Sequence, residues 1–175
     1  MLLAASWGPA LARNEAGDWE LGVHLGQTSF IDGDALDNDS FWGVNVGYSF
    51  NSIFELALNY DSISTEGEGF PKADLKILTL DFIFNGGKDS HRPFFLIGVG
   101  MMDQDARRVA GSGASVRADK DREVIELGLG YRGYLNRVVG IRVGARLFFT
   151  DSEGNGFGDD KDLRFSYGLA FNLSR

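Results

Sequence analysis

The chain has 175 residues and a net charge of −8, and it contains 24 Gly, 14 Phe and no Cys. The lack of Cys excludes a disulfide scaffold and a thiolate metal site, and the negative charge argues against a nucleic-acid partner. The length fits one domain. Many glycines together with many aromatic residues are typical of a β protein whose strands approach one another closely.

The first twelve residues, MLLAASWGPALA, are apolar and uncharged. They end in the small-x-small triplet Ala10-Leu11-Ala12, which is typical of a secretory cleavage site. We expect residues 1–12 to be a signal peptide that is truncated, because its basic beginning is missing. Residues 13–175 would then form one exported barrel domain that starts near Arg13. The alternative is an apolar N-terminus with no role in export.

From residue 18 onward, apolar residues alternate with small or polar ones, and this period of two predicts β-strands. The eight predicted strands span residues 18–28, 41–50, 53–61, 75–84, 92–102, 124–134, 138–151 and 163–173. Each is about ten residues long, the length that a tilted membrane-spanning strand needs. Leu75 and Ile77 break the alternation of the fourth strand, and we expect a bulge there.

The segments between the predicted strands alternate in length. Residues 30–40, 62–73, 103–121 and 151–162 are long and polar, whereas residues 51–52, 85–92 and 135–137 are shorter. Short turns at one end and long loops at the other are typical of an up-and-down barrel. We therefore predict an all-β fold, an eight-stranded antiparallel transmembrane β-barrel.

The two faces of the predicted strands favour a membrane barrel over a soluble one. One face is rich in Gly with scattered charges, which suits a narrow interior where charges pair. The other face is apolar and carries aromatic residues toward the strand ends, at Trp19, Trp42, Phe50, Phe54, Tyr60, Phe84, Phe149 and Phe165. Such residues form girdles at membrane interfaces. A soluble lipocalin-like carrier, with its apolar face inward, is the weaker alternative.

Charged residues on the Gly-rich face are expected to form a network in the barrel lumen. Its predicted members are Glu20, His24, Glu55, Asp61, Asp81, Glu126, Arg132, Arg142, Arg146 and Arg164. An isolated buried charge is very costly. We therefore expect Arg142 and Arg146 each to lie within hydrogen-bonding reach of a carboxylate. The expected partners are Glu20, Glu126, Glu55 and Asp81, with Glu126 and Glu20 leading.

With these features, the sequence resembles the small outer-membrane β-barrel proteins of Gram-negative bacteria, the OmpA/OmpX-type and opacity-like group. The resemblance covers roughly residues 17–173 and is carried by PFFLIGVGM, ELGLGYRGY and SYGLAFNL. The last stretch is similar to the signal that the barrel-assembly machinery reads, through Ser166, Gly168, Phe171 and Leu173. It differs from that signal because an aromatic residue does not end the chain. The resemblance implies an outer-membrane location, with the long loops outside the cell.

Two of the long loops are acidic. In residues 151–162, Asp151, Glu153, Asn155, Asp159 and Asp162 fall at positions of a calcium-loop template, which wraps oxygen atoms around a hard cation. Residues 32–39 hold four further Asp. The template match is partial and no helices flank the loop, so we interpret both segments as hydrated loops. A divalent-cation site is the alternative.

The loop predicted at residues 103–122 combines acidic residues with Arg107, Arg108, Arg117, Lys120 and Arg122. Guanidinium and ammonium groups form charge-assisted hydrogen bonds with phosphate. This loop is therefore a candidate for contact with lipopolysaccharide. The alternative is an ordinary loop of mixed charge.

Nothing in the sequence favours catalysis or a cofactor. We interpret His24 as a structural, hydrogen-bonded residue, and His91 is expected in a turn. Because a fold does not fix a function, two roles stay open. One is a non-enzymatic structural or surface-interaction role through the long loops, as a monomer in lipid and lipopolysaccharide. The other is a narrow conduit for small or apolar solutes.

Overall fold

The structure is a computed structural model that describes residues 16–30, 39–67, 70–86, 91–109, 115–151 and 157–173. All regular elements of these residues are β-strands. Their bounds are β1 Trp19–Phe30, β2 Asp39–Ser49, β3 Phe54–Gly67, β4 Phe70–Asn85, β5 His91–Val109, β6 Ser115–Tyr134, β7 Val139–Asp151 and β8 Phe157–Asn172. Within the same residues, no helix is long and apolar enough to cross a membrane.

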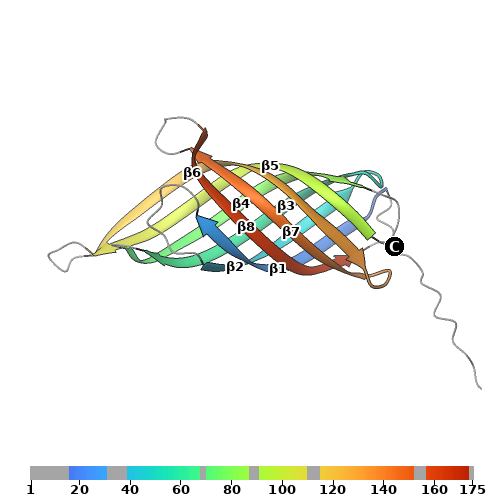
Figure 1. The fold of residues 1–175 in the computed structure, drawn as a ribbon, viewed down its shortest axis with the longest axis horizontal. Coiled ribbons are helices and arrows are strands. Elements are labelled where there is room, and N and C mark those ends of the chain that lie inside the picture. Colours follow the sequence, from blue (N-terminus) through green and yellow to red (C-terminus); the bar gives the residue numbers. More distant parts are fainter. Residues whose placement is uncertain are drawn as a thin grey trace, which may run out of the picture.

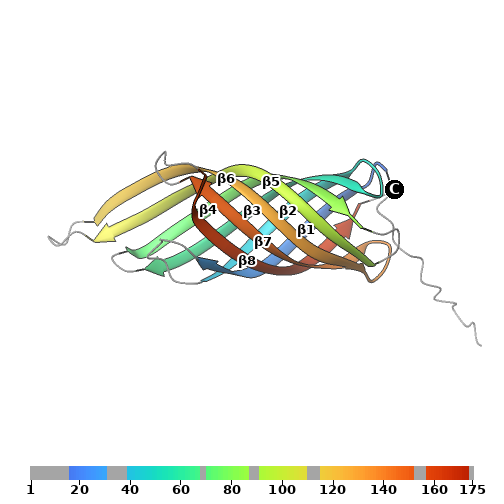
Figure 2. The same cartoon turned by 45° about the horizontal axis from the view of Figure 1, so that its top comes forward.

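The strands form one closed barrel in which every strand pairs antiparallel with its neighbours in sequence, and β8 pairs with β1 (Figure 1). The predicted fold class is therefore confirmed. The strands are strongly tilted, and the described ends of the chain lie at the end that carries the short connections (Figure 2). We call this the turn end and the opposite end the loop end.

Asn residues build two of the connections at the turn end. The Asn51 side-chain oxygen accepts hydrogen bonds from the backbone N–H groups of Ile53 and Phe54, at 2.8 and 2.9 Å. Asn136 makes the same pair of bonds to Val138 and Val139, both at 2.8 Å. Asn favours such turns because its short side chain replaces a backbone acceptor. These two turns therefore have a local sequence cause.

The apolar face of the strands points outward, as the alternation predicts. Leu21, Leu80, Ile97, Leu127, Val143 and Leu169 are each 38–44% exposed, and Val44 and Leu56 are half-buried. Aromatic rings form two chains of contacts near the turn end. One links Trp19, Tyr48 and Phe50, and the other links Phe54, Phe84 and Phe95, with centroid distances of 5.1–6.4 Å. These chains match the girdle expected at one membrane interface.

Several strand limits differ from the predicted ones. The strands have 11 to 20 residues rather than about ten, and the increase is largest in β5 and β6. Most of the segment predicted as a loop at 103–121 is paired strand, and so is most of 62–73. Backbone pairing does not require apolar side chains, so polar residues continue the hairpins toward the loop end.

The bulge predicted at Leu75 and Ile77 is wrong. Both residues keep the register of β4 and point inward, where they are buried together with Phe41, Ile63, Met102, Val124 and Phe148. The irregularity in this hairpin lies instead between Thr65 and Gly67. The apparent break in alternation therefore marks an apolar layer inside the barrel.

Candidate functional site: the barrel interior and the loop end

The barrel interior near the turn end is organised around Arg132. Arg132 donates to Glu55 through both terminal nitrogens, with Nη1–Oε2 at 2.8 Å and Nη2–Oε1 at 3.2 Å. Its Nη2 also lies 3.2 Å from Glu20 Oε1. The Tyr134 hydroxyl donates to Glu20 at 2.9 Å, and the Asn85 amide donates to Glu55 at 3.3 Å. The planar guanidinium suits this two-point binding of a carboxylate.

A second group of charges, nearer the loop end, is organised around Asp61. His24 Nε2 and Asp61 Oδ1 are hydrogen-bonded at 2.7 Å. Arg146 Nη1 lies 3.6 Å from Asp61 Oδ2 and 3.8 Å from Glu126 Oε2, and Arg164 Nη1 lies 3.7 Å from Asp61 Oδ2. Arg146 and Arg164 stand opposite each other on β7 and β8. Asp61 therefore offsets the repulsion between two directly opposed cations.

Arg142 differs from the expectation. Arg146 lies near the carboxylates of Asp61 and Glu126, but its hydrogen bond goes to Asn59 Oδ1, at 3.4 Å. Arg142 forms no ion pair with any carboxylate that the structure describes. Its guanidinium carbon lies 4.5 Å from the centroid of the Phe94 ring instead. Arg142 stands directly opposite Arg132 on β6, and Arg132 holds Glu55 and Glu20. The aromatic face is the remaining favourable partner at this level.

Apolar clusters lie among the charged groups of the interior. Ala57, Ile83, Phe94 and Leu96 form a buried cluster on the inner face. The larger apolar cluster that contains Phe41 and Phe148 lies toward the loop end, and the Arg164 guanidinium stacks over Phe148 at 3.9 Å. Large buried side chains thus occupy the interior at successive levels. This is the filling expected of an eight-stranded barrel.

Glycines on the inner face make room for these layers. A Cβ at Gly43 would collide with Asp61 Oδ1 and His24 Nε2, and one at Gly98 would lie 2.6 Å from Asp81 Oδ1. Gly43 pairs with His24 on β1 and with Asp61 on β3. A larger residue there would displace the hydrogen bond between His24 and Asp61. The charged side chains of the interior therefore require glycine at these positions of the inner face.

The structure places the predicted luminal residues on the inner face of the strands. Glu20, His24, Glu55, Asp61, Asp81, Glu126, Arg132, Arg146 and Arg164 are buried, and Arg142 is half-buried. The sequence reasoning missed Arg92, Tyr134 and Asp162, which are also buried there. In each strand, these residues alternate in step with the predicted luminal residues. The alternation could therefore have placed all three on the inner face.

The other predicted sites are described only in part. Glu153 and Asn155 lie outside the described residues, and for Asp151 and Asp159 only the backbone is described. Asp162 is buried inside the barrel, with an oxygen 3.5 Å from Arg164 Nη2. Among the described residues, no cluster of His, Asp or Glu could hold a metal ion. Asp162 thus belongs to the interior charges rather than to a surface loop.

Of the predicted lipopolysaccharide contacts, Arg122 is half-buried on β6. The side chains of Arg107, Arg108, Arg117 and Lys120 lie outside the described part, but the backbone register is defined. It places Arg107 opposite both Lys72 on β4 and Arg117 on β6. Three cationic residues therefore occupy one row across three strands. Lys72 was not identified from the sequence, because residues 62–73 were predicted to be a loop and the fourth strand to begin at Leu75.

The predicted assembly signal lies on β8. Ser166 and Gly168 follow the inner face, and Phe171 and Leu173 follow the outer face.

A Ser, His and Asp arranged as in a hydrolase would be one sign of catalysis. Here the His24 ring is hydrogen-bonded to Asp61 inside a charged cluster, which suits a structural role. The described residues thus give no positive evidence for catalysis.

Comparison with known proteins places this geometry in a class. An apolar outer face, a charged interior and eight antiparallel strands define a small outer-membrane barrel. The family model described as "Outer membrane protein beta-barrel domain" matches residues 1–174. The chain belongs to this family and to the outer membrane of Gram-negative bacteria, so the soluble lipocalin-like alternative is wrong.

Solved structures with the same fold include several small barrels. The surface protein A of Neisseria (NspA) matches with a TM-score of 0.66, 13% identity, and coverage of 89% of this chain and 98% of that one. OprG of Pseudomonas aeruginosa has a TM-score of 0.66, 14% identity, and coverage of 93% and 99%. The attachment invasion locus protein Ail of Yersinia pestis has a TM-score of 0.63, 15% identity, and coverage of 90% and 99%. No curated protein matches the sequence.

Proposed function

We propose that this protein is a non-enzymatic surface-interaction protein whose loop end binds polyanions, through phosphate or sulfate groups. The observation that carries the proposal is the cationic row of Lys72, Arg107 and Arg117 on the register of β4, β5 and β6. Like charges directly opposite one another are destabilising in a sheet. A bound anion would relieve this repulsion.

The neighbouring row on the same three strands has the opposite sign. Asp74, Asp105 and Asp119 are register partners, two residues closer to the turn end. The Ser64 hydroxyl donates to Asp74 at 2.7 Å. The cationic row therefore lies nearer the loop end than the acidic row does. An anion approaching from the loop end would therefore meet the cationic row first.

The filled interior supports contact through the outer parts of the molecule rather than a conduit. A conduit needs a continuous polar path, whereas apolar clusters with Phe94 and Phe148 lie among the interior charges here. The similar Ail barrel has been solved in complex with the heparin analogue sucrose octasulfate. That complex supports the proposal that a small barrel of this kind can bind polysulfated sugars. Lipopolysaccharide offers the same chemistry through its phosphates.

Binding of sucrose octasulfate and of lipopolysaccharide to the protein in lipid vesicles tests this function. Arg107→Gln should weaken binding roughly two- to fivefold, the effect of one exposed charge pair, and adding Lys72→Gln and Arg117→Gln should weaken it further. Arg137→Gln, in an exposed turn at the turn end, is the control and should leave binding unchanged. Unchanged binding by the triple variant would contradict the proposal.

A further inference from the structure

Arg142 has no hydrogen-bond acceptor among the residues that the structure describes. A guanidinium carries five N–H donors, and buried polar groups are almost always hydrogen-bonded. The contact with the Phe94 ring lies over its face and supplies no acceptor atom. Arg142 is half-buried and its nitrogens keep accessible surface, whereas the Nε atoms of Arg132 and Arg164 are enclosed. The Arg142 guanidinium therefore borders an open space on the inner face of the barrel.

The two carboxylates at this level are already bound by other groups. Both oxygens of Glu55 accept hydrogen bonds from Arg132. One oxygen of Glu20 lies 3.2 Å from Arg132 Nη2, and the other accepts a hydrogen bond from the Tyr134 hydroxyl. Neither acid therefore has an oxygen left for Arg142.

Positive charge accumulates around Arg142. The register places Arg92, Arg132 and Arg142 opposite one another in one row across β5, β6 and β7. Arg146 follows on the same face of β7, four residues further along the strand. Like charges directly opposite one another destabilise a sheet. A negative charge beside Arg142 would therefore stabilise the barrel.

Gly144 leaves room next to Arg142 on the inner face of β7. A Cβ at Gly144 would meet no atom closer than the Leu129 carbonyl oxygen, at 3.4 Å. The next nearest atoms are Phe94 Cζ at 3.6 Å and Ser166 Oγ at 3.7 Å. The Phe94 ring also lies beside the Arg142 guanidinium, with 4.5 Å between its centroid and the guanidinium carbon. The ring therefore borders both the guanidinium and the space over Gly144.

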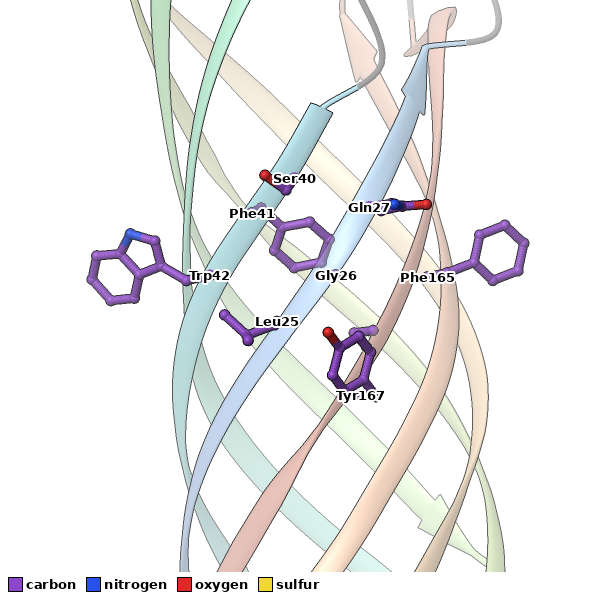
Figure 3. A pocket seen from close by; sticks show the side chains of 9 residues that line it. Leu25, Gly26, Gln27, Ser40, Phe41, Trp42, Phe165 and Tyr167 are labelled. Atoms are coloured by element: carbon purple, nitrogen blue, oxygen red, sulfur yellow. The ribbon is translucent and has the colours of Figure 1, made fainter.

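Ser166 contributes a hydroxyl to the same space. It lies on β8 between Phe165 and Tyr167, whose side chains are 55% and 62% exposed on the outer face. Figure 3 shows Phe165 extending away from the barrel, so the alternation of the strand turns Ser166 inward. Gly144 is its register partner on β7. Among the described residues, none forms a hydrogen bond with the Ser166 hydroxyl.

We propose that the barrel interior binds one small monovalent anion, such as chloride, between the Arg142 guanidinium and the Ser166 hydroxyl. The anion accepts hydrogen bonds from both groups, and the positive edge of the Phe94 ring favours it further. Water could accept the same hydrogen bonds, but it would leave the repulsion among the arginines in place. One negative charge is what Arg142 lacks, so a monovalent ion is favoured. This site is separate from the polyanion site at the loop end.

Urea unfolding in phosphatidylcholine vesicles tests this site, with chloride replacing gluconate at constant ionic strength. An ion that binds only the folded protein raises the folding equilibrium constant by one plus the ratio of its concentration to Kd. The increase should thus be about elevenfold when chloride is at ten times its Kd. Arg142→Met should remove this dependence on chloride. Arg137→Met, in an exposed turn, is the matched control and should retain it.

Two results would overturn the proposal in this measurement. One is a parent protein whose unfolding does not depend on chloride, and the other is an equal dependence in Arg142→Met, which would mean a general salt effect. Ser166→Ala keeps the guanidinium and tests the site even if Arg142→Met does not fold. It should weaken chloride binding roughly two- to tenfold, the net value of one hydrogen bond. Unchanged binding by Ser166→Ala would overturn the assigned position of the ion.

Crystals grown with bromide in place of chloride locate the ion directly. The anomalous scattering of bromide should give a peak beside Arg142 in the parent protein and none there in Arg142→Met. Bromide found only on the outer surface of the barrel would overturn the proposal.

Discussion

At the scale of single residues, the interior contains two kinds of buried arginine. Arg132 binds two carboxylates, one of them through two hydrogen bonds. Arg142, directly opposite on β7, contacts an aromatic ring instead. Removing one partner of a buried ion pair leaves an uncompensated charge, whereas removing a cation that lacks a carboxylate does not. The two residues should therefore respond very differently to the same substitution.

Arg132→Met should lower the free energy of unfolding by about 3–5 kcal/mol, because Glu20 and Glu55 lose their common cation. Arg142→Met should cost no more than about 2 kcal/mol, the upper range of a cation–π contact. Urea unfolding in lipid vesicles, followed by tryptophan fluorescence, measures both values. Equal losses for the two variants would contradict the pairing described for Arg132.

Glycine positions allow a second comparison at this scale. Gly43→Ala places a Cβ against Asp61 and His24 and should destabilise the barrel by about 1–3 kcal/mol, the cost of overpacking. Gly144→Ala is the control, because the nearest atom to its new Cβ, the Leu129 carbonyl oxygen, is 3.4 Å away. That variant should be neutral or slightly more stable in the same unfolding measurement. Destabilisation by Gly144→Ala alone would contradict the packing described here.

At the scale of the strands, the cost of placing a charge at different depths in the membrane tests which residues face lipid. Val143→Arg on β7 puts a charge at the lipid-facing surface and should cost about 2–4 kcal/mol at mid-membrane. Val138→Arg, in the exposed turn before β7, lies near the interface and should cost about 0–1 kcal/mol. Unfolding of the two variants in vesicles gives both costs. A low cost at Val143 would mean that this position does not face lipid.

The hairpin of β5 and β6 extends beyond the pairing of β6 with β7. Toward the loop end, the described pairs of β6 with β7 stop at Val124 and Thr150, while Ser115–Glu123 pair with β5. Amide hydrogens on the unpaired edge of 115–123 should exchange much faster than those of 125–133. Hydrogen exchange resolved by residue measures this difference. Uniform protection would show that another strand covers this edge.

The sequence was sufficient for the direction of each strand face but not for the strand ends. The period of two fixed which side of β4 or β7 faces outward, because a slip of one residue would reverse every side chain. The ends of β5 and β6 could not be predicted, because polar residues such as Asp103 and Arg117 are compatible with loops and with paired strands. Backbone pairing, which depends on neighbouring strands, decides between them.

The sequence predicted that charged residues fill the interior, but not which of them pair with one another. Placing the charges on one face needed only parity, and those residues are buried. Which acid meets which base depends on strand stagger around the barrel, which sequence spacing does not give. Glu126 lies near Arg146, as expected, but Glu20 lies near Arg132 rather than near Arg142 or Arg146. Phe94 occupies the place where a carboxylate was expected beside Arg142.

At the scale of the whole molecule, the barrel has an interior filled by buried side chains. Arg132 and Arg146 lie beside interior carboxylates, Arg142 lies over Phe94, and apolar clusters lie among these groups. The loop end carries the cationic row that is proposed to bind polyanions. The proposed surface-interaction role, unlike a conduit, is expected with a lumen that does not conduct.

Conductance across planar bilayers tests this closed interior most directly. Purified protein should insert without producing steady ion-conducting steps, while an open porin added to the same bilayers produces them. Insertion is verified separately by the tryptophan emission of the same preparation in vesicles. The folded protein is expected to give no conductance. Reproducible single-channel steps from folded, inserted protein would contradict it and favour a conduit.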